Sequence, residues 1–85
     1  MPRLRVDADT SEAELVEHLA LLHSGWHDID DRRPILAAEI EAASRAVREP
    51  IEYEYEVGIR AMNDLHDEIE RLTNIIRHRR SRVVA

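Results

Sequence analysis

The chain has 85 residues, with 18 acidic against 12 basic side chains, a formal net charge of −6 and no cysteine. Disulfides and thiolate zinc sites are therefore excluded, and so short a chain forms only a marginal core unless it binds a metal or self-associates. No stretch is long and apolar enough to span a membrane, and no basic start followed by an apolar run resembles a signal peptide. We therefore expect a cytoplasmic protein.

Charge is distributed unevenly along the sequence. Residues 7–70 contain all 18 acids and five arginines, a net charge of −13, whereas residues 71–85 contain five arginines and no acid. Arginines in a last helical turn complement the helix dipole, but they can also contact phosphates in a non-specific, salt-sensitive way. The candidate polyanion-binding residues are Arg77, Arg79, Arg80 and Arg82.

The sequence predicts three parts: a flexible polar arm over residues 1–9, one helical domain over residues 10–80, and a basic, flexible tail over residues 81–85. In the arm, Leu4 and Val6 alternate with charged side chains. That alternation is typical of a short strand, which would need a partner to pair with.

A first helix is predicted over about residues 11–24. Ser11 and Glu14 match the capping box S-x-x-E, which satisfies free amides at a helix start. Gly25 is expected to end this helix in a left-handed conformation, with Trp26 folding back on Leu21.

A second helix is predicted over about residues 34–48, after a polar connection. Asp30 or Asp31 could cap it, and Pro34 is tolerated in a first turn. A proline biases the residue before it away from helical geometry, so Pro50 is either the first residue of a new helix or a kink in a continuous one. The predicted helix bounds follow the first alternative.

The segment 51–57 fits two patterns. Apolar and acidic residues alternate between Pro50 and Gly58, as in a strand. However, apolar residues and Gly58 also recur at spacings of four and three from Ile51 onward, which is a heptad seam and favours a third helix over about residues 51–79. The seam residues after Ile51 are Tyr55, Gly58, Met62, Leu65, Ile69, Leu72 and Ile76.

The predicted fold is all-α: a three-helix hairpin or bundle with a long C-terminal amphipathic helix, and a short strand at 51–57 as the minor alternative. The two shorter helices would each span about 21 Å and the third about 42 Å. Because the short helices cannot cover both ends of the seam, we expect a homodimer or higher oligomer in which the seam residues form the interface. Gly58 in the seam indicates either a close helix crossing or a helix start.

Histidines and carboxylates are the reactive groups available. His66 and Glu70 are four residues apart, as are Glu14 and His18, and such pairs could bind zinc or iron between helices or subunits. The full candidate set is His66, Glu70, His18, Glu14, His23 and His27. The chain lacks the H-E-x-x-H and Glu-x-x-His metal motifs, phosphate-binding glycine loops and a nucleophile elbow, so no catalytic residue is assigned and no cofactor is expected.

The sequence therefore predicts a small, non-catalytic, intracellular adaptor or regulatory protein. It would self-associate through its long C-terminal helix and present an acidic surface to a protein partner, with its densest patch at Glu49, Glu52, Glu54 and Glu56. Two alternatives are kept: a metal-binding helical protein, and nucleic-acid binding through the arginine-rich tail.

Overall fold

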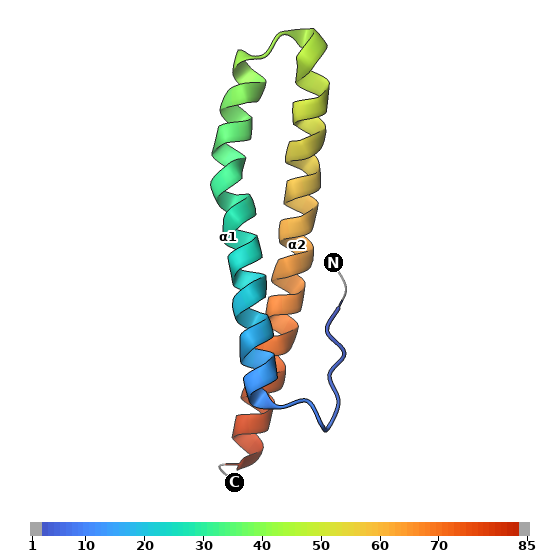
Figure 1. Ribbon diagram of the computed structural model, residues 1–85, viewed down its shortest axis with the longest axis vertical. Helices are drawn as coiled ribbons and strands as arrows, with labels where there is room; N and C mark the ends of the chain where they lie inside the picture. The colour runs from blue at the N-terminus through green and yellow to red at the C-terminus, as the bar shows by residue number, and fades with distance from the viewer. Residues whose placement is uncertain (1–2, 84–85) are drawn as a thin grey trace.

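The computed structural model describes residues 3–83 and forms a helical hairpin (Figure 1). Helix α1 spans Glu12–Ala42 and helix α2 spans Arg45–Val83, with a turn at residues 43–44 between them. The molecule measures 60 × 19 × 15 Å. An extended arm precedes α1 and runs beside the lower half of α2 in Figure 1 before it reaches the first turn of α1. Residues 1–2 of the predicted arm and 84–85 of the predicted tail lie outside the described residues.

The all-α prediction is confirmed, but the predicted number of helices is wrong. Residues 11–24 and 34–48 were expected to form two helices, and α1 instead runs through Gly25 and the polar connection. Gly25 does not adopt a positive φ, so it does not end the helix. The reason is a second periodicity: Leu15, Leu22 and Leu36 are buried in α1 at multiples of seven residues, which keeps one face of a single helix against α2.

Neither proline marks the start of a helix: Pro34 was expected in the first turn of a second helix and Pro50 at the boundary before a third. Pro34 lies inside α1 and Pro50 lies inside α2, and both are exposed. The chain reverses instead at Ala43, whose backbone is extended at φ −77° and ψ 143°. The carbonyl of Ser44 then accepts hydrogen bonds from the amides of Val47 and Arg48, which begins α2.

Two local predictions hold in the described residues. The capping box is present, because the Ser11 hydroxyl accepts from the Glu14 amide and the Glu14 carboxylate accepts from the Ser11 amide. Residues 51–57 are helical, which removes the strand alternative and confirms the helical interpretation of the heptad pattern.

The predicted contact of Trp26 with Leu21 is not formed as part of a helix end. Trp26 lies within α1 and packs against the core, while Leu21 is exposed.

The core is concentrated at the end of the hairpin that carries the chain termini. Its central buried residues are Leu15, Leu22, Leu65, Leu72 and Ile76. Leu4 and Val6 of the arm pack against this cluster, so three chain segments meet there. We call residues 3–27 and 63–83 the terminal half, and residues 28–62 the loop half. The loop half has two helices alone, and its buried apolar side chains are Leu36 and Met62.

Neither α1 nor α2 contains a segment long and apolar enough to cross a membrane, within residues 3–83.

Candidate functional site

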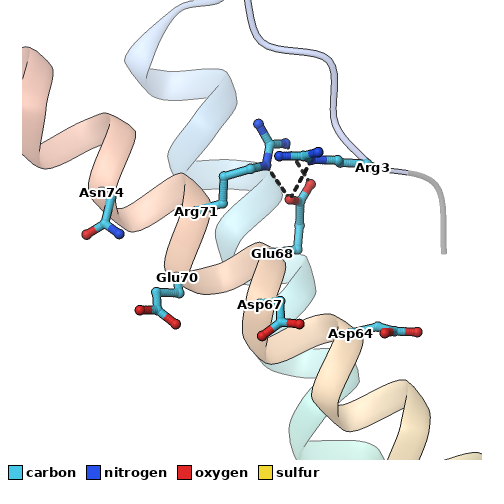
Figure 2. A pocket seen from close by; sticks show the side chains of 7 residues that line it. All are labelled: Arg3, Asp64, Asp67, Glu68, Glu70, Arg71 and Asn74. Carbon is cyan, nitrogen blue, oxygen red and sulfur yellow. Dashed lines mark hydrogen bonds and ion pairs between the residues drawn. The ribbon is translucent and has the colours of Figure 1, made fainter.

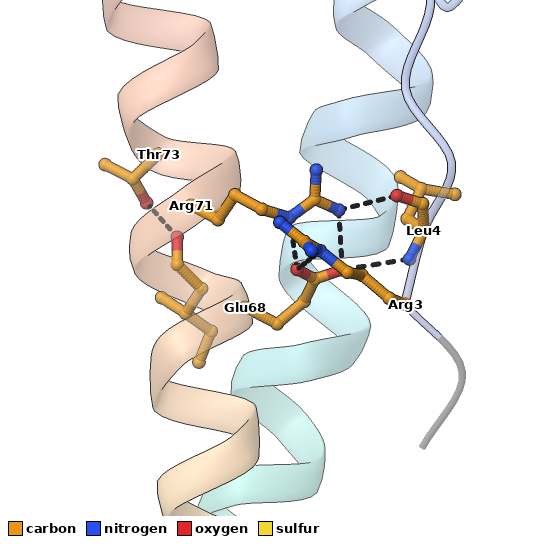
Figure 3. Close-up of polar contacts among 6 residues, drawn as sticks. Arg3, Leu4, Glu68, Arg71 and Thr73 are labelled. Atoms are coloured by element: carbon orange, nitrogen blue, oxygen red, sulfur yellow. Dashed lines mark hydrogen bonds and ion pairs between the residues drawn. The ribbon is translucent and has the colours of Figure 1, made fainter.

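The arm is held to α2 by an ionic cluster centred on Glu68 (Figure 3). The Glu68 carboxylate accepts a hydrogen bond of 2.9 Å from the backbone amide of Leu4, and the Arg71 guanidinium donates to the carbonyl of the same residue. Arg71 also donates to Glu68 through Nη2 at 2.8 Å. Arg3 adds a longer contact, with its Nε 3.8 Å from Glu68 Oε1. One ion pair on α2 therefore binds both the backbone amide and the backbone carbonyl of a single arm residue, Leu4.

Glu68 is the ionisable group most strongly affected by these contacts. Its side chain is 10% exposed. The hydrogen bond from Arg71, helped by the Leu4 amide and the charge of Arg3, lowers the pKa of Glu68 from 4.5 to about 2, although burial opposes this shift. The same pairing raises the pKa of Arg71 above its ordinary value. Glu68 is therefore ionised when the arm is bound near neutral pH.

The other end of the arm is held by arginines near the end of α2. Arg79 donates through Nη1 to the carbonyl of Thr10 and through Nη2 to that of Asp7, at 3.0 Å for the second contact. Arg80 pairs with Glu12 in the first turn of α1. Two of the four arginines predicted to bind polyanions thus contact their own chain, while Arg77 and Arg82 are exposed.

Two cavities border the arm, one on each side. On the α2 side, a cavity of about 570 Å³ is lined by Arg3, Asp64, Asp67, Glu68, Glu70, Arg71 and Asn74. Figure 2 shows the carboxylates of Asp64, Asp67 and Glu70 along α2, beside the pair of Glu68 and Arg71. On the α1 side, a cavity of about 290 Å³ is lined by Leu4, Arg5, Thr10, Glu14, Glu17, His18 and Leu21.

A second groove, which we call the loop-half groove, lies between α1 and α2 near Gly58. It has a volume of about 310 Å³ and is lined by Ile29, Leu36, Tyr55, Val57, Gly58, Ile59 and Met62, with Asp28, Arg32, Arg33 and Glu54 at charged positions. Arg32 Nε lies 3.6 Å from Glu54 Oε1 across it. Gly58 contributes no side chain, and its backbone lies close to Ile29 of α1.

The seven seam residues predicted to form an oligomer interface fall into two groups. Leu65, Ile69, Leu72 and Ile76 belong to the core of the terminal half, which includes residues of α1. Tyr55, Gly58 and Met62 line the loop-half groove. The seam alone therefore gives no reason for a second copy, because α1 of the same chain covers much of it.

The predicted metal ligands are spread over the hairpin. His66 and Glu70 are adjacent, with Nε2 and Oε2 3.9 Å apart, and both side chains are exposed. Glu14 and His18 both border the cavity beside the arm, whereas His23 and His27 are exposed on α1. Within residues 3–83, no three histidine, aspartate or glutamate side chains gather closely enough to hold a metal ion.

Sequence reasoning did not single out Glu68, Arg71 or Arg3. The spacing of Glu68 and Arg71 is that of an i, i+3 ion pair, which is common on exposed helix faces. Its contact with Leu4 joins residues far apart in the sequence, and no local pattern records it.

No family model matches the chain, and no curated protein and no solved structure matches it either. Function has to be inferred from the geometry described above.

Proposed function

We propose that this protein is a non-catalytic helical interaction module that self-associates through the loop half of its hairpin. The observation that carries this proposal is the sparse packing of that half. Val57 is 41% exposed and Tyr53 66% exposed, and Ile35 and Val47 are also exposed. Two helices share only one seam, and helical hairpins commonly complete their cores by adding two more helices.

The occupant we propose for the loop-half groove is a second copy of the chain in antiparallel orientation. Residues 28–62 contain nine acids and five arginines, a net charge of −4, whereas the terminal half contains nine acids and seven arginines, a net charge of −2. Within the terminal half, residues 71–83 contain five arginines and no acid. Parallel pairing would place two loop halves of charge −4 side by side. Antiparallel pairing brings each loop half toward the less acidic half of the other copy and its arginines at residues 71–83, which favours that orientation.

The acidic surface proposed to meet a protein partner lies on another face of α2. Glu49, Glu52 and Glu56 are exposed and spaced by three and four residues, so they share one face of the helix. None of them lines the loop-half groove. A basic surface on a partner protein would complement this face while the groove side is occupied by the second copy.

Sedimentation analysis of the full chain tests the proposal. Val57→Glu places a charge in the groove and should shift the chain toward monomer, with at least a tenfold weaker dimer constant. Ala38→Glu adds the same charge at an exposed position of α1 that does not line the groove and should leave association unchanged. Equal association of both variants and the wild type, with helix content retained, would rule out the groove as the interface.

A further inference from the structure

The groove that holds the arm has the features of a binding site for an extended polypeptide. Three of its polar contacts are made to arm carbonyls and one to an arm amide, from Glu68, Arg71 and Arg79. Hydrogen bonds to backbone groups do not depend on the side chains of the bound segment. The site can therefore accept many sequences, as do other sites that bind extended segments. The arm side chains that pack against the core are Leu4 and Val6, two residues apart, so the site selects its occupant through two apolar side chains at this spacing.

The arm is bordered by hollows that its own side chains only partly line. Cavities of about 570 and 290 Å³ lie on its two sides. Leu21 borders the smaller one and is 65% exposed. His18, in the same wall, has its Nε2 atom shielded from solvent but without a hydrogen-bond partner among the described residues. An occupant with larger side chains and a polar group near His18 would make contacts that the arm does not make.

Release of the arm would also not leave a buried charged side chain without a partner. Glu68 and Arg71 are paired with each other on α2, so both keep a partner when Leu4 departs. Helix α1 has its own cap in Ser11 and Glu14. The exposed turn before it is held locally, because the Asp7 carboxylate accepts from the amides of Asp9 and Thr10. This turn is a natural hinge for the arm.

We propose that the groove binds an extended segment of a partner protein, with two apolar side chains two residues apart preceded by basic residues, and that the arm is a built-in competitor. The basic residues are inferred from Asp64 and Asp67, which line the larger cavity beyond Arg3 (Figure 2). Docked in place, the arm shields the site, and the partner segment displaces it. This site is separate from the loop-half groove.

The test uses the full chain and a fluorescent peptide that carries the sequence of residues 3–10 preceded by two further arginines. The double variant Leu4→Ser, Val6→Ser weakens the internal competitor, so it should bind the peptide at least tenfold more tightly than the wild type. Adding Arg71→Ala, which removes the donor to the carbonyl at the Leu4 position, should then abolish most of this binding, whereas adding Arg77→Ala, an exposed arginine of the same helix, should not. A control peptide with serine in place of its leucine and valine should not bind.

Circular dichroism of each variant verifies that the hairpin is folded. The proposal is overturned if no variant of retained helicity binds the peptide, or if the control peptide binds equally well. It is also overturned if the wild type is a dimer that the double variant converts to monomer, because the groove would then hold the arm of a second copy. Peptide binding should be unchanged by Val57→Glu even if that variant no longer self-associates, since Val57 lines the loop-half groove and neither cavity beside the arm.

Discussion

A Cβ atom placed on Gly58 would lie 3.3 Å from Cγ2 of Ile29, closer than ordinary van der Waals contact. The glycine in the heptad seam thus marks a close approach, but to α1 of the same chain. At Gly25 the corresponding Cβ would lie 3.7 Å from Leu65 Cδ1, an ordinary contact. The two glycines differ in what a methyl group would meet, although both are in helix interiors.

This difference predicts opposite effects for two alanine substitutions. Gly25→Ala should raise the free energy of unfolding by about 0.5–1 kcal/mol, because alanine loses less backbone entropy in a helix. Gly58→Ala should show little gain or a loss, because Ile29 must move. Gly58→Leu should cost about 1–3 kcal/mol by overpacking. Chemical denaturation measures all three, and equal stabilisation by both alanines would contradict the close approach at Gly58.

Pro34 offers a test of the continuous first helix. Proline inside a helix removes one backbone hydrogen bond and crowds the preceding turn, at a cost of about 3 kcal/mol. Because Pro34 is exposed within α1, Pro34→Ala should stabilise the chain by about 1–3 kcal/mol and raise its helix content. If Pro34 were instead the first residue of a separate helix, the substitution would be nearly neutral in thermal denaturation.

The arm should detach in acid. The pKa of Glu68 is lowered to about 2 by Arg71 and the arm, below its ordinary 4.5, so the ionised carboxylate is the form that these contacts stabilise. Its contribution is fully present above about pH 4.5 and is lost as the pH falls toward 2. Amide hydrogen exchange or the NMR signal of Leu4 would report this release.

Two variants separate this effect from general acid unfolding. Glu68→Gln should release the arm at neutral pH as well. Glu70→Gln changes a neighbouring exposed carboxylate that lies 3.9 Å from His66 Nε2 and makes no contact with the arm backbone, and it should leave the arm bound. An arm that remains protected in Glu68→Gln would contradict the role given to this cluster.

The antiparallel pairing can be tested by disulfide crosslinking, since the chain has no cysteine of its own. Ser44→Cys lies in the turn and Ser81→Cys lies near the opposite end, and both positions are exposed. A mixture of the two variants should form crosslinks mainly between positions 44 and 81. Parallel pairing would give crosslinks between two copies of position 44 and between two copies of position 81.

The parts of the fold that were predictable have local causes. The helix start at Ser11 depends on residues within one turn, and the helical seam after Ile51 depends on a repeat carried by α2 alone. The errors came from taking Gly25 as a helix end, Pro34 as part of a helix start and Pro50 as the boundary between two helices. The spacing of seven from Leu15 through Leu22 and Ile29 to Leu36 was visible in the sequence, and it indicated one long helix whose packing outweighs these local costs.

The candidate site was less predictable, because its contacts join the two ends of the chain. Leu4 meets Glu68 and Arg71, and Asp7 meets Arg79, only after the hairpin has formed. The alternation at Leu4 and Val6 suggested a short strand in a flexible arm, whereas residues 3–7 form no strand and both side chains pack against the core. The binding place of this arm is a groove between helices rather than the edge of a sheet, and no pattern within the arm specifies that.

Light scattering of the wild-type chain over a wide concentration range tests the central claim, that the loop half is incomplete in a single copy. The account predicts a molar mass that rises from one chain toward two as concentration increases. A mass of one chain at every concentration, with the hairpin folded, would contradict it.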